Sequence, residues 1–215
     1  ELKGGVTVIS LYSRYPRRLI YKMLLFVSTL CLVAAASAQF PARCEAPMEW
    51  EGDAASHDHN YKYQRYGKVS YDAYNQRVRF VDKIYFDNRT EYSDSLYLHR
   101  EHVEYRIDMK TRKCEKRPIT WEWYPEEVPR NSTFYGEAYL GASIPEAGVE
   151  VSMWGAEYKE SSGATVRWNG EFTTVGCIPV HTSRSRSSDY VSTHFYDVTV
   201  GISDPNVFIP PKECL

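Results

Sequence analysis

Bulky and polar residues alternate along much of the chain with a period of two residues, not the 3.6 residues of a helix. This alternation is typical of β-strands that bury one face and expose the other. It predicts strands over residues 77–82, 95–99, 105–109 and 119–124. Aromatic and β-branched residues predict further strands over residues 133–140, 149–154, 164–174 and 190–200.

Short segments of turn-forming residues separate these predicted strands. They lie at residues 87–88, 141–143, 161–163 and 183–188. Strands that recur about every ten residues, without helices between them, favour antiparallel sheets that pack face to face or close into a barrel. Without an internal repeat or a long linker, the pattern predicts one all-β domain.

The N-terminal part follows a different pattern. An uncharged apolar run extends from Met23 to Ala38 and ends in small residues, as a secretory signal peptide does, so we expect cleavage after Ala38. The run has about 16 residues, fewer than the ~20 that a helix needs to cross a membrane, so no transmembrane anchor is expected. We therefore divide the chain into a leader (residues 1–22), a signal peptide (23–38) and one β-domain (39–215).

Removal of the first 38 residues makes the protein more acidic. The whole chain has 26 Lys and Arg against 28 Asp and Glu, a formal charge of -2. Residues 1–38 contain five basic residues and one acidic residue, so 21 against 27 remain and the formal charge becomes -6. An acidic domain gives no reason to expect nucleic-acid binding, and the ordinary charged fraction of 25% argues against disorder.

The cysteine count changes in the same way, because Cys31 lies in the signal peptide. The remaining four are Cys44, Cys114, Cys177 and Cys214. An even number in a secreted chain predicts two disulfides, and the wide spacings do not fit the Cys-x-x-Cys pattern of zinc or redox sites. Four cysteines allow three pairings, and spacing does not choose among them.

Two sequons acquire meaning if the chain is secreted. Asn88 begins Asn-Arg-Thr and Asn131 begins Asn-Ser-Thr, with no proline in the middle position. We expect N-linked glycans at both asparagines, which places them on exposed loops or strand ends.

The sequence contains no recognisable catalytic motif. It lacks the Gly-x-Ser-x-Gly pattern of many serine hydrolases and the glycine-rich patterns of nucleotide sites, and its cysteines are best used in disulfides. His57-Asp58-His59 is the most metal-like cluster, but residues 51–60 are polar and are expected to form a loop, which does not favour a metal there. We therefore expect a protein that is not an enzyme.

Calcium is compatible with the composition, although no EF-hand spacing is present. Calcium needs only oxygen ligands, which scattered loops supply. The carboxylates expected near the surface include Asp82, Asp87, Asp94, Asp189, Asp197 and Asp204. They do not define a site.

Aromatic residues are abundant, with 27 in the predicted mature domain. Some of them are expected to line a surface beyond a minimal core, since tryptophan and tyrosine present an apolar body and a polar tip to an amphiphile. A cavity between sheets could hold a hydrophobic ligand; its expected walls are Trp121, Trp123, Trp154 and Trp168. The alternative for each tryptophan is packing in the core.

Landmarks over residues 44–214 resemble the ependymin-related family of extracellular glycoproteins. The landmarks include Cys44-Glu45-Ala46-Pro47, Trp50-Glu51-Gly52, Trp154-Gly155, Thr174-Val175-Gly176-Cys177-Ile178-Pro179-Val180 and Gly201-Ile202-Ser203-Asp204-Pro205. The resemblance implies two stacked, curved antiparallel sheets that enclose a hydrophobic pocket, similar to bacterial lipoprotein carriers, and usually a homodimer. It also implies the disulfides Cys44–Cys177 and Cys114–Cys214.

The resemblance associates the chain with lipid binding, calcium binding and cell-matrix contact. Together with the aromatic content, it predicts a secreted, non-enzymatic glycoprotein that binds a hydrophobic or amphiphilic ligand. The alternative is a calcium-binding component of the extracellular matrix or of cell adhesion.

Overall fold

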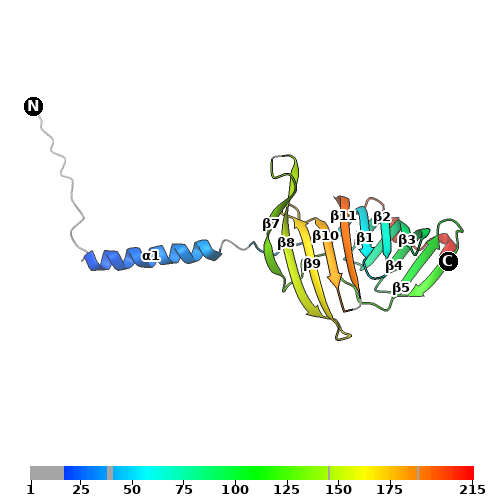
Figure 1. The fold of residues 1–215 in the computed structure, drawn as a ribbon, viewed down its shortest axis with the longest axis horizontal. Coiled ribbons are helices and arrows are strands. Elements are labelled where there is room, and N and C mark those ends of the chain that lie inside the picture. Colours follow the sequence, from blue (N-terminus) through cyan, green and yellow to red (C-terminus); the bar gives the residue numbers. More distant parts are fainter. Residues whose placement is uncertain (1–16, 38–40, 145, 188) are drawn as a thin grey trace, which may run out of the picture. The chain divides into compact units, whose positions relative to one another are not determined.

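The computed structural model describes residues 17–37, 41–144, 146–187 and 189–215, which form two compact units, residues 1–42 and 43–215. The first unit contains one helix, α1 (Arg17–Ser37), which covers most of the predicted signal peptide (Figure 1). Within the described residues, no helix is both long and apolar enough to span a membrane. The expected cleavage after Ala38 lies outside the described residues, so it stays a prediction.

The second unit is built on an antiparallel sheet of eleven strands (Figure 1). The strands are β1 (Glu49–Asp58), β2 (Tyr63–Asp72), β3 (Arg77–Phe86), β4 (Arg89–Leu98), β5 (Val103–Asp108), β6 (Cys114–Pro118), β7 (Thr133–Gly141), β8 (Gly148–Lys159), β9 (Thr165–Thr173), β10 (Pro179–Ser185) and β11 (Tyr190–Val200). Their order across the sheet is β6-β5-β4-β3-β2-β1-β11-β10-β9-β8-β7. The predicted antiparallel all-β class is confirmed.

Two meanders form this sheet, and they join at its centre. Strands β1 to β6 are consecutive hairpins, as are β7 to β11, and β1 pairs with β11 from Trp50–Val200 to Asp58–Val191. The two sheets expected from the family resemblance are therefore two halves of one continuous hydrogen-bonded sheet. The sheet is not closed, because β6 and β7 are its edge strands.

A two-residue turn shows how local sequence sets the register of a hairpin. Asp87 and Asn88 have φ angles of 49° and 63° and connect β3 to β4, where Phe86 pairs with Arg89. Two successive positive φ angles match the right-handed twist of the strands, and Asp and Asn tolerate this conformation. The turn predicted at residues 87–88 is confirmed.

Several elements differ from the sequence prediction. Residues 51–60, predicted as a loop, lie mostly in β1, and part of the loop predicted at 183–188 belongs to β10. The strands β2 and β6 were not predicted at all. In β1, the small residues that fill the cavity-facing positions after Trp50, among them Gly52 and Ala54, conceal the alternation on which the prediction depends.

The predicted strand at residues 119–124 is also wrong, for a topological reason. The edge strands β6 and β7 lie at opposite ends of the sheet and are joined by residues 119–132, which we call the crossover segment. The crossover segment must traverse the sheet, and it does so over one face. There Ile119 is buried, residues 120–122 are exposed and residues 123–124 are half-buried, so the alternation of bulky and polar residues in the sequence does not correspond to a strand.

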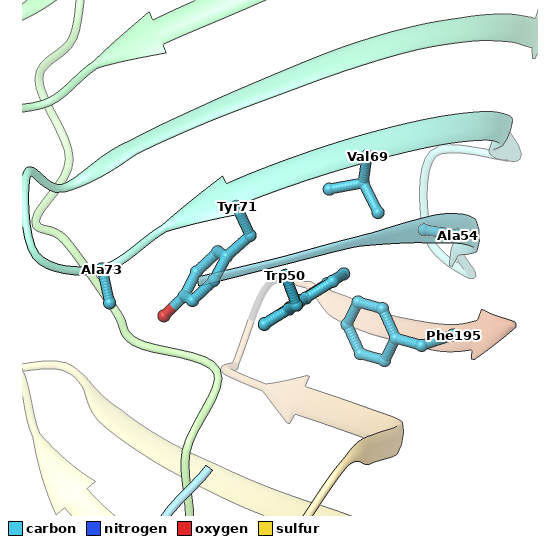
Figure 2. Close-up of a cluster of buried hydrophobic side chains, with 6 residues drawn as sticks. All are labelled: Trp50, Ala54, Val69, Tyr71, Ala73 and Phe195. Atoms are coloured by element: carbon cyan, nitrogen blue, oxygen red, sulfur yellow. The ribbon is translucent and has the colours of Figure 1, made fainter. Parts of the chain in front are cut away.

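Two hydrophobic clusters lie beneath the crossover segment. The central cluster contains Trp50, Ala54, Val69, Tyr71, Ala73 and Phe195, and Figure 2 shows Trp50 between Tyr71 and Phe195. The lateral cluster contains Val128, Trp154, Trp168, Phe172 and Cys177. Because Val128 comes from the crossover segment and is fully buried, this segment forms part of the core.

Two disulfides attach the ends of this unit to the sheet. They join Cys44 to Cys177 and Cys114 to Cys214, the pairs that the family resemblance implies. The sequence separations are 133 and 100 residues, for which the chain-entropy model gives about 5 kcal/mol of stabilisation each. Covalent attachment therefore holds both terminal segments against a sheet that has two free edges.

Candidate ligand-binding site

A cavity of ≈ 270 Å³ lies between the central cluster and the crossover segment. Strands β1, β2, β3, β4, β10 and β11 supply one wall, and the crossover segment supplies the other. Eight aromatic side chains line it: Trp50, Tyr71, Phe80, Tyr97, Trp121, Trp123, Tyr124 and Phe195. The cavity is therefore walled mainly by rings, as expected for a site that holds an apolar group.

The rings form a contact network that fixes the shape of the cavity. Trp50 stacks on Tyr71 with centroids 5.0 Å apart, and Tyr71 stacks on Trp123 at 5.5 Å. Phe195 meets Trp50 edge to face at 5.3 Å. The Glu126 amide also donates a hydrogen bond of 2.9 Å to the Tyr71 hydroxyl. The position of the crossover segment thus depends on the same rings that line the cavity.

The structure brings together two of the four tryptophans expected at the pocket. Trp121 and Trp123 line the cavity, and Trp121 is 48% exposed at its outer side. Trp154 and Trp168 are instead buried in the lateral cluster, where they pack with Phe172. For these two, the alternative of core packing holds, because they lie on β8 and β9, away from the central strands.

Trp50 is a wall residue that sequence reasoning did not assign to the pocket. It is fully buried, lines the cavity and lies at the start of β1. Its Nε1 atom has no hydrogen-bond partner among the described residues. Since buried polar atoms are nearly always hydrogen-bonded, this unpaired donor is an exception within the central cluster. The available signal was the Trp50-Glu51-Gly52 block among the landmarks of the family resemblance.

Two arginines, Arg65 and Arg184, supply positive charge to the cavity wall. Arg65 stands over the Phe80 ring at 3.9 Å and donates through Nε to Asp82 at 2.5 Å. Asp82 is buried and also accepts a hydrogen bond of 2.7 Å from Ser93. Because Arg65 is held on both sides, its guanidinium has a fixed position at the edge of an otherwise aromatic cavity.

A second cavity of ≈ 390 Å³ adjoins the first, and a larger share of its lining residues is charged. The two share five lining residues: Trp121, Tyr124, Glu126, Arg184 and Thr193. The second cavity extends to Arg186, which pairs with Glu160 and with Asp189. The site therefore changes from aromatic at the central cluster to charged at β10, an arrangement that suits an amphiphile.

Charge pairs also bear on the calcium expectation. Asp82, Asp94 and Asp189 each pair with an arginine, and Asp204 caps the short 3-10 helix η1 (Pro205–Phe208). In the part of the chain that the structure describes, no three His, Cys, Asp or Glu side chains are arranged to hold a metal ion. Calcium binding stays a prediction.

Both sequons lie at the surface. Asn88 is exposed in the turn between β3 and β4, and Asn131 is exposed just before β7. These positions agree with the expected loops and strand ends, while the glycans themselves stay predictions.

An antiparallel sheet with a cavity lined largely by aromatic side chains on one face, covered by a crossover segment and attached at its ends by two disulfides, defines the class: an all-β protein with a partly open aromatic cavity. The Ependymin family model matches residues 87–214. The chain is 36% identical to mammalian ependymin-related protein 1 of Mus musculus, over 88% of this chain and 84% of that protein. It therefore belongs to the ependymin family.

Ependymin-2 of Carassius auratus is 30% identical, over 87% of this chain and 86% of that protein. Among solved structures, an uncharacterized conserved protein from Thermus thermophilus has a TM-score of 0.43 at 9% identity, over 77% of this chain and 87% of that chain. Mycobacterium tuberculosis lipoprotein LppX has a TM-score of 0.33 at 10% identity, over 71% of this chain and 88% of that chain.

Proposed function

We propose that this chain is a secreted, non-enzymatic glycoprotein that binds a hydrophobic or amphiphilic, lipid-like ligand between the sheet and the crossover segment. The observation that carries the proposal is the cavity of ≈ 270 Å³ lined by eight aromatic side chains. Membership of the ependymin family supports a binding role rather than catalysis. The predicted signal peptide, disulfides and sequons support secretion.

The physical basis is the burial of apolar ligand surface against fixed rings. Removing apolar surface from water contributes about 25 cal/mol per Å², or about 0.8 kcal/mol for each buried methylene group. A short alkyl segment in the aromatic cavity therefore contributes several kcal/mol. The guanidinium groups of Arg65 and Arg184, which also line the cavity, offer donors to a polar group of the same ligand.

Trp121 gives the ligand a route of entry in this proposal. It contacts Tyr97 and His99 only edge to face, at 6.2 and 6.0 Å, and almost half of its surface is exposed. A side chain held by two edge contacts rotates more easily than the stacked Trp123. The crossover segment then acts as the wall beside which the ligand enters.

Organic extracts of the natively purified protein, analysed by mass spectrometry, test the proposal together with titration of a fluorescent fatty acid. We expect a co-purified amphiphile and saturable binding of the probe. Trp121→Ala should weaken probe binding about tenfold, which corresponds to one lost aromatic contact of ~1.4 kcal/mol.

Tyr139→Ala is the matched control, because Tyr139 is also 48% exposed but lies on the edge strand β7. It should leave probe binding unchanged. A ligand-free extract together with no probe binding would overturn the proposal. The calcium-dependent matrix or adhesion role and the homodimer stay predictions, which calorimetry with calcium and sedimentation of the purified protein address separately.

A further inference from the structure

Four of the chain's six histidines lie together on the outer face of the sheet, opposite the cavity. Ser56, Thr182 and Phe195 line the two cavities, so the residues next to them along each strand point to the other face. These neighbours include His57 on β1, His181 on β10 and His194 on β11, and the fourth histidine, His59, stacks on His57.

His181 and His194 form a cross-strand pair. They are direct partners in the register between β10 and β11, and their rings stack with centroids 4.4 Å apart and an angle of 25° between planes. Because the rings stack, both must rotate about their side-chain torsions before one nitrogen of each points to a common ion about 2.1 Å away. Imidazole nitrogen is a preferred ligand of Zn²⁺ and Cu²⁺.

A carboxylate on the next strand stands beside this pair. Glu171 of β9 is the register partner of His181, and its Oε1 lies 3.8 Å from His181 Nδ1. This distance is longer than a hydrogen bond, so a shift of the Glu171 side chain is needed before it accepts from Nδ1 and leaves Nε2 free to bind a metal.

We propose that His181 and His194 bind one divalent transition-metal ion, of the Zn²⁺ or Cu²⁺ class, with Glu171 orienting His181. Within the described residues no third His, Cys, Asp or Glu converges on the pair, so water completes the coordination. The site therefore exchanges its metal and has open positions for an external ligand. Calcium does not compete for it, because calcium prefers oxygen ligands.

The second pair, His57 and His59, provides an internal control. Its rings stack at 4.2 Å, but His59 Nε2 lies 3.3 Å from the Ser192 hydroxyl and the ring also stacks on Tyr190 at 4.7 Å. These contacts engage His59 from two sides. His57 and His59 lie on the same face of the sheet as the proposed site. Their removal therefore tests whether metal binding needs His181 and His194 or only any histidines on this face.

Calorimetric titration of the tag-free protein with zinc chloride tests the site, and electron paramagnetic resonance with Cu²⁺ counts the coordinated nitrogens. We expect one ion bound with two nitrogens, and an affinity that falls at least tenfold in both His181→Ala and His194→Ala. Glu171→Gln should weaken binding about tenfold, as removal of an orienting carboxylate does. The double variant His57→Ala/His59→Ala should bind as the wild type.

Near-ultraviolet circular dichroism checks that each variant is folded. If His181→Ala does not fold, the exposed His194→Ala decides, because its ring contributes little to the core. Absence of uptake by the wild-type protein, unchanged binding in His194→Ala, or loss of this ion in His57→Ala/His59→Ala would each overturn the proposal.

Discussion

Arg65 is the residue that most directly joins the stability of the sheet to the cavity. It lines the aromatic cavity while it pairs with Asp82, whose side chain is 1% exposed. A buried ion pair contributes little compared with apolar residues, yet removal of one partner leaves an uncompensated charge. Arg65 therefore has a structural role whatever the ligand is.

Replacing Arg65 by methionine should lower the free energy of unfolding by about 3–5 kcal/mol, because Asp82 loses its buried partner. The double variant Arg65→Met/Asp82→Asn should recover much of this loss. Urea unfolding of the two variants and of Asp82→Asn completes the thermodynamic cycle. Additive effects of the two substitutions would contradict the proposed coupling.

Asp72 makes stability depend on pH at acid values. It is fully buried at the end of β2, accepts hydrogen bonds from Asn75 and pairs with Arg77 at 2.6 Å. Burial alone raises the pKa of Asp72, but the bonds from Asn75 and Arg77 outweigh it, so the folded-state pKa lies below the ordinary value. The stabilisation is complete above an unfolded pKa of about 3.9 and is lost as the pH falls through the folded pKa.

Asp72→Asn should therefore be less stable than the wild type at pH 6, and the two should converge as the pH falls through the folded-state pKa of Asp72. Chemical unfolding between pH 2 and pH 6 gives both curves. Glu137→Gln, an exposed change on β7, serves as the control and should shift stability little at any pH. A constant difference between Asp72→Asn and the wild type would contradict the assignment.

At the scale of elements, the sequence pattern was reliable where a strand alternates large apolar residues with polar ones. Strands β3, β4 and β5 were predicted for this reason, whereas β8 and β11 were predicted from their aromatic and β-branched residues. The central strand β1 was not, because its cavity face continues from Trp50 into small residues such as Ala54. Residues 119–124 were wrongly predicted as a strand, because bulky and polar residues alternate in their sequence although the segment pairs with no strand.

Local patterns do not contain the order of the strands, which explains why only two of the four tryptophans expected at the pocket line it. Trp121 and Trp123 were identified from aromatic content alone. Their position over Trp50 and Tyr71 depends on the order of strands across the whole sheet, which a local pattern does not contain. Trp154 and Trp168 have the same composition signal but lie on strands that place them in the lateral cluster.

The hydrogen bond between the crossover segment and β2 gives a test at this scale. Tyr71→Phe removes the acceptor of the Glu126 amide and should cost about 1 kcal/mol of stability. Because the ring and its stacking remain, the central cluster should persist. Hydrogen exchange should become faster within residues 119–132 and stay unchanged in β1 and β8; a uniform increase over the sheet would contradict a local anchor.

For the folded unit of residues 43–215 as a whole, one topological fact connects the cavity, the core and the chain ends. A sheet whose consecutive meanders meet at β1 and β11 leaves β6 and β7 at its two edges, and the chain must cross a face to join them. The crossing covers the central strands and forms one wall of the aromatic cavity. The site is thus a consequence of the strand order.

The most direct test of this account is photo-crosslinking of the protein with a diazirine-bearing fatty acid, followed by peptide mapping. The cavity predicts labels on residues 119–132 and on the inner positions of β1 and β2, removed by excess unlabelled fatty acid. Labels that concentrate on the outer face or the edge strands, or that excess fatty acid does not remove, would contradict a ligand site beneath the crossover segment.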